Sequence, residues 1–507
     1  MLSDSGGPAR RWFAPSRLTG FARRFAWLAV VPALMMGDVA QSASLMNSVC
    51  PRLPTNIGPR GPVVDSVGPR FDPTFRSSPG GASQYGTAGG GSTGGASGNG
   101  NASNGGGSTS TKPQVASRRT RSGVPPANEL HYIRDEVVFE AAGNPSDQAL
   151  IGLLNRFHLA RIETRRIALL NTTFYRARIL DGTTVPVKLR AMEAAGAVRA
   201  QPNYLFTMVQ SATQSADAPQ GAQQGADSAQ YALAKLRLDE AHTLARGDNV
   251  LVAVIDSGID VNHPALTGVV EKSFDALNSS EGPHSHGTAI AGIIAGHNRL
   301  IGAAPAVHIL AARAFSTTQG STVSIIASLD WAAQQGARVV NMSFAGPSDP
   351  ALGRSLAAAH QKGVVLVAAS GNAGPKSPPL WPAADPNVIA VTATDFDDHL
   401  FAMANRGAYV ALAAPGVDIL VANPGDTYKM ESGTSFSAAF VSGVAALVIE
   451  RQPKLTPDGV KKVLLATAHD LGPKGRDDQF GAGLMDAFQA VSAVDKSTDA
   501  ALQVPAH

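Results

Sequence analysis

Cysteine is almost absent from this chain, since Cys50 is the single one in 507 residues. A disulfide framework needs pairs of cysteines, and a thiolate zinc site needs several, so both are excluded. Cys50 also lies ahead of the region that is predicted to fold. A cysteine nucleophile is therefore excluded there as well.

Charged residues make up only 16% of the chain, and they are unevenly divided. Residues 1–130 carry 13 Lys/Arg against 5 Asp/Glu, which leaves 29 against 34 for the rest. The part that is predicted to fold is thus mildly acidic, which argues against a nucleic-acid-binding protein. It also lacks a Gly-x-Gly-x-x-Gly turn and a phosphate loop, which argues against a nucleotide-binding domain.

The N-terminus has the layout of an export signal. Five arginines precede an apolar run over residues 25–36, and the small residues Ala40, Ser42 and Ala43 follow. The run is too short to span a bilayer comfortably, so residues 1–43 are predicted to be a cleaved signal peptide. An uncleaved anchor is the alternative. Contact with a membrane is expected only through this signal.

Residues 44–130 are dominated by Gly, Ser, Pro, Asn and Thr. Such a stretch buries too little apolar surface to offset the entropy of ordering it, so a disordered N-terminal region is predicted. It is either a plain spacer or a surface-attachment module. The basic residues Arg118, Arg119 and Arg121 indicate either a processing site or a solvated patch.

A small domain is predicted over residues 131–210. Its pattern is strand, helix, strand, helix, strand, with Ser146 as the cap of the first helix. This order predicts a small α+β, ferredoxin-like layer of helices on a sheet, without a catalytic set. The linker at 211–229 is rich in Gln, Ala, Ser and Gly and is predicted to be open to proteolysis. Such a layout is typical of a zymogen, and equally of a tandem-domain protein.

A large domain is predicted over residues 230–495, followed by a tail at 496–507. Residues 250–255 form a continuous apolar run, which is typical of a central parallel strand buried on both faces. Further strands alternate with helices, so we expect an α/β fold with a doubly wound, mainly parallel sheet. Asp256 follows the apolar run, at the carboxyl end where functional groups gather in such sheets.

Three more polar residues stand at ends of predicted elements. His286 opens a helix of small residues, Asn372 ends a strand between glycines, and Ser435 precedes an apolar helix over 436–450. Taken singly, Asp256 and Asn372 are equally turn residues, and Ser435 is equally a helix cap. A metal site on His284, His286 and His297 is not expected, because no cysteine or suitably spaced carboxylate completes it. His284 is predicted to be a solvated neighbour.

Together these residues give the chain a clear likeness. It resembles the subtilisin-like serine peptidases in five segments that follow in the same order. These are Val254-Ile255-Asp256-Ser257-Gly258-Ile259-Asp260, His286-Gly287-Thr288, Asn341-Met342-Ser343-Phe344, Ser370-Gly371-Asn372 and Gly433-Thr434-Ser435. The order Asp, His, Ser is the order of subtilisin.

The resemblance implies a role for each of these residues. Ser435 would attack the scissile carbonyl, His286 would carry the proton, and Asp256 would orient the imidazole. The side chain of Asn372 and the backbone N–H of Ser435 would form the oxyanion hole. Protein or peptide substrates would bind along Ser343, Phe344, Ala345 and Gly371, with the loop near residues 315–319 opposite.

The small domain resembles the N-terminal propeptide of the same family, including its closing stretch Gln201-Pro202-Asn203-Tyr204. The resemblance implies an intramolecular inhibitor whose tail lies in the active-site groove, and a cut between about Val209 and Gln230. The protein would then be a secreted, self-processed serine endopeptidase. An inactive, peptidase-like binding protein is the alternative.

The chain departs from the family in the loop at residues 297–301. The calcium-binding loop of many relatives is missing or shortened there, and Arg299 disfavours a cation. We therefore expect no metal site and no cofactor.

Overall fold

The computed structural model describes residues 122–141, 145–196, 198–209, 230–279 and 281–494. The predicted signal peptide, most of the predicted spacer, the linker at 211–229 and the tail at 496–507 lie outside these residues. Two parts of the chain are described below: a small module over residues 122–209 and a large domain over residues 230–494.

The small module is a four-stranded antiparallel sheet with two helices. Its elements are β1 (Tyr132–Ala141), α1 (Asp147–Arg156), β2 (Leu159–Ile167), β3 (Thr172–Ile179), α2 (Val185–Ala194) and β4 (Val198–Met208). The strands lie in the order β2-β3-β1-β4, which is ferredoxin-like. The predicted pattern omitted β2. Ser146 does cap α1, as predicted, since its hydroxyl accepts from Ala149 N at 3.3 Å.

The core of this module lies between the sheet and its two helices. Phe139 and Tyr175 stack on neighbouring strands with ring centroids 5.3 Å apart, and Leu189 and Met192 of α2 are fully buried in the same cluster. The module begins before residue 131, which was the predicted boundary. The N–H of Gly123 donates to the carboxylate of Glu193 at 2.6 Å.

The large domain contains a seven-stranded sheet whose strand pairings are all parallel, in the order β14-β13-β12-β10-β5-β7-β6. The strands are β5 (Leu251–Asp256), β6 (Val270–Asp275), β7 (His308–Arg313), β10 (Val339–Met342), β12 (Val365–Ala369), β13 (Val388–Thr394) and β14 (Val410–Pro415). The predicted doubly wound α/β fold is therefore confirmed.

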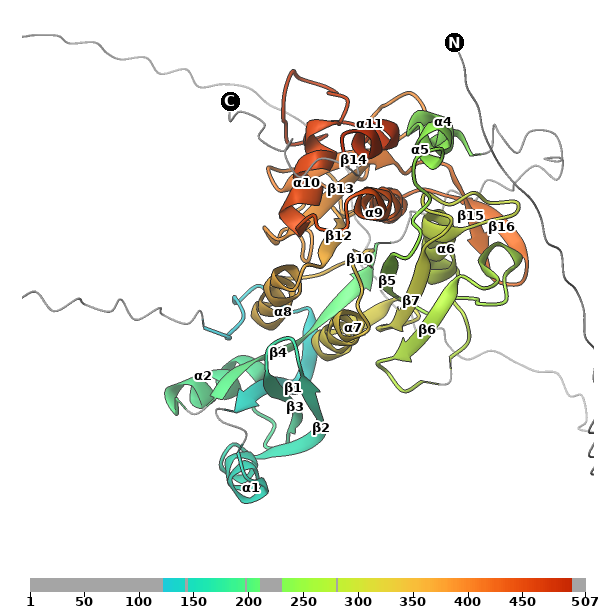
Figure 1. The fold of residues 1–507 in the computed structure, drawn as a ribbon. Coiled ribbons are helices and arrows are strands. Elements are labelled where there is room, and N and C mark those ends of the chain that lie inside the picture. Colours follow the sequence, from blue (N-terminus) through green and yellow to red (C-terminus); the bar gives the residue numbers. More distant parts are fainter. Residues whose placement is uncertain (1–121, 142–144, 197, 210–229, 280, 495–507) are drawn as a thin grey trace, which may run out of the picture. The chain divides into compact units, whose positions relative to one another are not determined.

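Helices cover both faces of this sheet, as Figure 1 shows with strands β5 and β10 between α7 and α9. Val252 and Val254 of β5 pack in one buried cluster with α6 and α9, whereas Ala253 and Ile255 pack in the other with α7 and α8. Successive side chains of a strand point to opposite faces. The uninterrupted apolar run of β5 therefore supplies side chains to both buried clusters.

The helices of the domain are α4 (Tyr231–Lys235), α5 (Leu238–His242), α6 (Ser285–Ala295), α7 (Thr322–Gln334), α8 (Pro350–Gln361), α9 (Thr434–Arg451), α10 (Pro457–Ala466) and α11 (Ala487–Ser492). A short hairpin of β15 (Ile419–Asn423) and β16 (Thr427–Glu431) precedes α9. By length and composition α9 could cross a membrane, yet 89% of its apolar window is buried in the protein. It is the core helix of this domain.

Candidate active site

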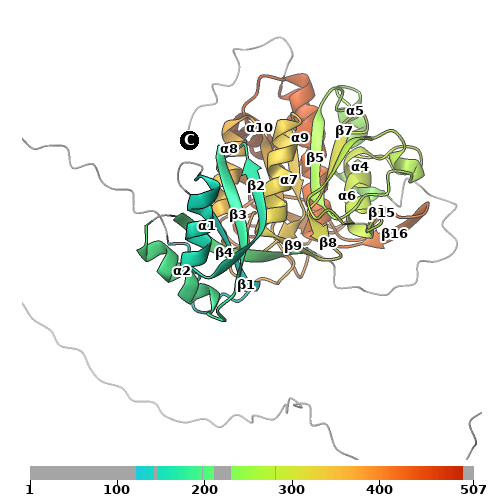
Figure 2. The ribbon, with the colours of Figure 1, turned by 90° about the horizontal axis from the view of Figure 1, so that it is seen from below.

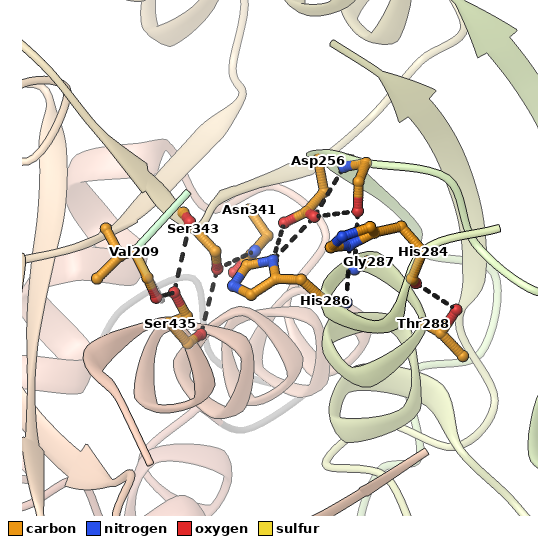
Figure 3. Close-up of polar contacts among 10 residues, drawn as sticks. Val209, Asp256, His284, His286, Gly287, Thr288, Asn341, Ser343 and Ser435 are labelled. Carbon is orange, nitrogen blue, oxygen red and sulfur yellow. Dashed lines mark hydrogen bonds and ion pairs between the residues drawn. The ribbon is translucent and has the colours of Figure 1, made fainter. Parts of the chain in front are cut away.

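Asp256 and His286 are brought together at the carboxyl end of β5. Asp256 is the last residue of that strand, and His286 lies in the first turn of α6. The imidazole Nδ1 is 2.9 Å from both carboxylate oxygens of Asp256 (Figure 3). The backbone N–H and hydroxyl of Ser257 also donate to Asp256 Oδ1, at 2.7 and 3.0 Å. The carboxylate is thus buried and fully engaged.

This contact fixes the tautomer of His286. A carboxylate only accepts hydrogen bonds, so Nδ1 carries a proton, and in the neutral ring Nε2 then holds the lone pair. Nε2 is buried and has no hydrogen-bond partner within the residues that the structure describes. The imidazole therefore presents a basic nitrogen to the site.

Ser435 lies in the first turn of α9. The helix begins at Thr434 and its cap is Gly433, so Ser435 is not the capping residue. Its hydroxyl donates to the carbonyl oxygen of Val209 at 2.9 Å rather than to His286 (Figure 3). The N–H of a residue in a first helical turn has no acceptor within the helix, and the helix dipole is positive there.

Asn372 lies beside the start of the same helix. Its Oδ1 accepts from the backbone N–H of Thr434 at 3.1 Å and from the Thr434 hydroxyl at 2.9 Å. The amide group is thereby oriented, with its nitrogen on the opposite edge from Thr434. Gly371, just before it, has φ +112°, and a Cβ there would lie 2.5 Å from Asn405 Nδ2. That position needs a glycine.

The carboxyl end of β4 occupies a groove in the large domain. It runs antiparallel to β11 (Phe344–Ala345) on one side and to β9 (Gln319–Ser321) on the other, and Figure 2 shows β4 leading toward β9. Met208, the last residue of β4, and Val209, which follows it, continue this ladder of backbone hydrogen bonds. Met208 N donates to Thr318 O at 3.1 Å, and Val209 N donates to Ser343 O at 3.2 Å. Val209 is thereby held with its carbonyl at Ser435.

Residues 247–483 match the sequence model of the subtilase family. Subtilisin DY of Bacillus licheniformis is 34% identical over 254 residues, which cover 48% of this chain and 92% of that protein. Thermitase of Thermoactinomyces vulgaris is 33% identical over 273 residues, with coverages of 52% and 96%. Subtilisin Savinase of Lederbergia lenta is 35% identical over 272 residues, with coverages of 52% and 99%.

The chain belongs to the subtilase family.

This membership makes it a serine endopeptidase, a hydrolase that acts on peptide bonds of proteins. The solved structure of fervidolysin from Fervidobacterium pennivorans, described as a keratinolytic enzyme related to subtilisin, has a similar fold. The TM-score is 0.60 at 24% identity, and the match covers 73% of this chain and 62% of that one.

Most of the residues that the sequence singled out in this subtilase converge on one place. Asp256 and His286 are hydrogen-bonded, and the His286 ring lies 6.2 Å from the ring of Phe436, the residue after Ser435. Ser343, Phe344 and Ala345 line the groove against β4 and Val209. Asn372 is tied to Thr434, next to Ser435. Gly371 stands behind it, with its N–H bonded to Thr434 Oγ1 at 3.2 Å.

One prediction about the site was wrong, because His284 is not a solvated neighbour. It is half-buried, it caps α6, and its Nδ1 accepts from the backbone N–H of His286 at 3.2 Å. Burial lowers the pKa of the His284 imidazole, which favours the neutral form that can act as an acceptor. The sequence signal for this capping role was the position of His284, two residues before His286 at the start of the predicted helix.

Sequence reasoning also missed a buried polar chain beneath the groove. Ser442 of α9 donates to Asn341 Oδ1, and Asn341 Nδ2 donates to the hydroxyl of Ser343, each at 2.9 Å. The Ser343 hydroxyl in turn donates to the backbone carbonyl of Ser435 at 3.2 Å. These hydrogen bonds join α9 to β10 next to Ser435.

The loop at 297–301 is joined to the start of the domain. Gln230 Nε2 donates to Ile301 O at 3.1 Å, and Ile301 N donates to Gln230 Oε1 at 3.2 Å. Across the described ranges, no group of three or more His, Cys, Asp or Glu side chains is arranged to hold a metal ion.

Proposed function

We propose that this subtilase is made as a secreted zymogen and cuts peptide bonds with Asp256, His286 and Ser435. The observation that carries the proposal is the position of Val209. Its carbonyl oxygen lies 2.9 Å from Ser435 Oγ, at the end of a strand that is held in the groove. A peptide carbonyl at the nucleophile, on an added strand, is the arrangement of a bound substrate or product.

Proton transfer would run through His286. Asp256 holds the Nδ1–H of the imidazole at 2.9 Å and leaves the Nε2 lone pair facing the site. For attack, the Ser435 hydroxyl turns from the carbonyl of Val209 to Nε2, which takes its proton as the oxygen bonds to carbon. The same nitrogen then gives the proton to the leaving amine, and the carboxylate stabilises the imidazolium between the two steps.

The oxyanion hole would be formed by the side-chain nitrogen of Asn372 and the backbone N–H of Ser435. Two hydrogen bonds from Thr434 hold the Asn372 oxygen, which fixes where the amide nitrogen points. The Ser435 N–H lies at the positive end of α9. Donors fixed before reaction stabilise the developing charge without reorganising.

The small module would be the inhibitory propeptide, here residues 131–210 with the preceding segment from 122. Its β4 blocks the groove between β9 and β11. We place the self-cleavage at the Val209–Gln210 bond, because Val209 supplies the carbonyl at Ser435. Residues 1–43 would be the export signal, 44–130 mainly a spacer, 211–229 the linker and 230–495 the mature peptidase, with its tail at 496–507.

A covalent fluorophosphonate probe for serine hydrolases tests the catalytic assignment. Processed wild-type protein should be labelled on Ser435, as located by peptide mass spectrometry, and Ser435→Ala should not be labelled. The matched control is Ser437→Ala, two residues along the same helix, whose hydroxyl bonds to Ala414 O at 2.9 Å. Processed wild-type protein that stays unlabelled would favour the inactive, peptidase-like binding protein.

A further inference from the structure

Several polar contacts join the small module to the large domain away from the cleavage site, among them Leu169 N–H to Asp330 and Arg354 to Glu140. The most deeply buried is formed by Gln201 of β4, Thr322 at the start of α7, and Asp349, the cap of α8. Gln201 is eight residues before Val209, or about 25 Å along an extended strand. We call Gln201, Thr322 and Asp349 the latch cluster.

Asp349 accepts several hydrogen bonds from groups of the large domain itself. Its Oδ1 accepts from the backbone N–H groups of Ala351 and Leu352 at 2.9 and 3.0 Å. Its Oδ2 accepts from the hydroxyl of Thr322 at 2.6 Å. The side chain is 1% exposed, and burial raises the pKa of its carboxyl group. A buried carboxylate of this kind is costly unless its partners are complete.

Gln201 completes these partners with both edges of its amide. Nε2 donates to Asp349 Oδ1 at 2.6 Å, and Oε1 accepts from the N–H of Ala351 at 2.9 Å. Gln201 is itself only 5% exposed. The pair therefore requires a group that donates and accepts at once, without charge. A carboxylate at position 201 would face Asp349 as a like charge.

The main chain of the same strand supports this contact. The N–H of Tyr204 donates to Thr322 Oγ1 at 3.0 Å, and the same hydroxyl donates to Asp349. Thr322 is fully buried. The large domain therefore contacts the side chain of residue 201 and the backbone N–H of residue 204.

We propose that the latch cluster is a second docking site of the peptidase for its own propeptide, selective for a neutral carboxamide, and that it sets how long the cut propeptide stays bound. The inference rests on the proposed zymogen function. The contacts in the groove are mainly backbone ladders, which a substrate strand can replace. The latch cluster lies outside that ladder, so a competing substrate does not displace it directly.

The test uses the full-length chain and follows two events in one sample. Self-cleavage is followed on a gel, and hydrolysis of a fluorogenic peptide reports release of the propeptide. The delay between the two events is the latency. Gln201→Glu should shorten the latency about 10- to 100-fold, because a buried like-charge pair replaces a hydrogen-bonded one. Gln201→Met, which removes both hydrogen bonds without adding charge, should shorten it about tenfold.

A double variant separates the effect of charge from that of the hydrogen bonds. Asn is also a good helix cap, so Asp349→Asn keeps α8 capped through its Oδ1. Because that same oxygen faces position 201, the double variant Gln201→Glu with Asp349→Asn removes the like-charge pair but still sets two acceptors against each other. Its latency should therefore be longer than that of Gln201→Glu and close to that of Gln201→Met. Asp135→Asn, on an exposed part of the same module, is the matched control and should leave the latency unchanged.

The outcomes separate the two proposals. Wild type that does not cut itself overturns the zymogen function. Normal self-cleavage with unchanged latency in both Gln201→Glu and Gln201→Met overturns the latch cluster. If Gln201→Glu does not fold, Gln201→Met and the double variant decide, and wild-type latency in both overturns the latch cluster. A double variant as fast as a folded Gln201→Glu contradicts the proposed selectivity against charge.

Discussion

The large domain and the small module contribute to the same site in different ways. The large domain contributes side chains, among which a carboxylate and an imidazole meet at 2.9 Å. The small module contributes mainly backbone, since the last residues of β4 are held by ladders to β9 and β11. The proposed reaction therefore depends on which side chains the large domain carries. The position of β4 in the groove depends mainly on main-chain hydrogen bonds.

This difference predicts how each region responds to substitution. In the large domain, a change of one atom type should remove activity and leave the fold intact. In the groove strand, an exposed side chain should be replaceable, whereas an added Cβ in the groove wall should interfere.

Asp256→Asn should give the largest loss. The amide no longer requires a proton on Nδ1, so the imidazole can adopt the tautomer that cannot accept from Ser435. We expect kcat to fall by about 10,000-fold with KM nearly unchanged. Steady-state kinetics on a peptide substrate measure this. Asp397→Asn, at an exposed position, is the control, and a loss below about tenfold for Asp256→Asn would remove the carboxylate from the mechanism.

Asn372→Leu should cost less, because one of two oxyanion donors remains. We expect kcat to fall by about 100- to 1,000-fold, again with little change in KM. Asn262→Leu, at an exposed position of the same domain, serves as the control. If instead KM rises and kcat is preserved, Asn372 contributes to ground-state binding and the proposed oxyanion hole is incorrect.

Gly346→Ala tests whether the fit of the β4 backbone in the groove controls self-cleavage. A Cβ at this position would lie 2.3 Å from a ring carbon of Phe206, so the ring or the strand has to move. Overpacking of this kind should slow self-cleavage about tenfold. Thr207→Ala, which changes an exposed side chain of the same strand, should leave the rate unchanged. Equal effects of the two variants on the cleavage time course would contradict the contrast.

His284→Asn should give the smallest effect, and one confined to low pH. Burial lowers the pKa of His284 in the folded protein below its usual value of 6.5. Its contribution to stability is therefore present above about pH 6.5 and is lost as the pH falls through the folded-state pKa. Asn can keep the cap without titrating.

The measurement is urea unfolding at about pH 7.5 and about pH 5.5, within the usual titration range of histidine. A Ser435→Ala background prevents self-digestion. The protein that retains His284 should lose more stability between the two pH values than the His284→Asn variant does. An identical loss in both proteins would mean that His284 does not titrate as an acceptor.

Much of the large domain could be predicted because its strands are apolar on both faces. The run at 250–255 indicated β5, and Asp256 at its end indicated the site. β2 could not be predicted so easily, since its burial alternates irregularly and only Leu159 and Ile167 at its ends are buried. Charged residues fill most of the positions between them.

The contacts that sequence reasoning missed depend on how the folded elements are arranged. His284 precedes His286 by two residues, yet its role depends on where α6 starts. Gln201 and Asp349 are 148 residues apart, and only the docking of β4 places them together. Motifs identify residues that react, whereas side chains that hold one module against another carry no such local pattern.

The most direct test of the account is the intact mass and N-terminal sequence of the protein made as wild type and as Ser435→Ala. The account predicts that wild type separates into a piece that ends at Val209 and one that begins at Gln210, and that Ser435→Ala remains joined at this bond. Cleavage of Ser435→Ala between the same two residues would contradict it.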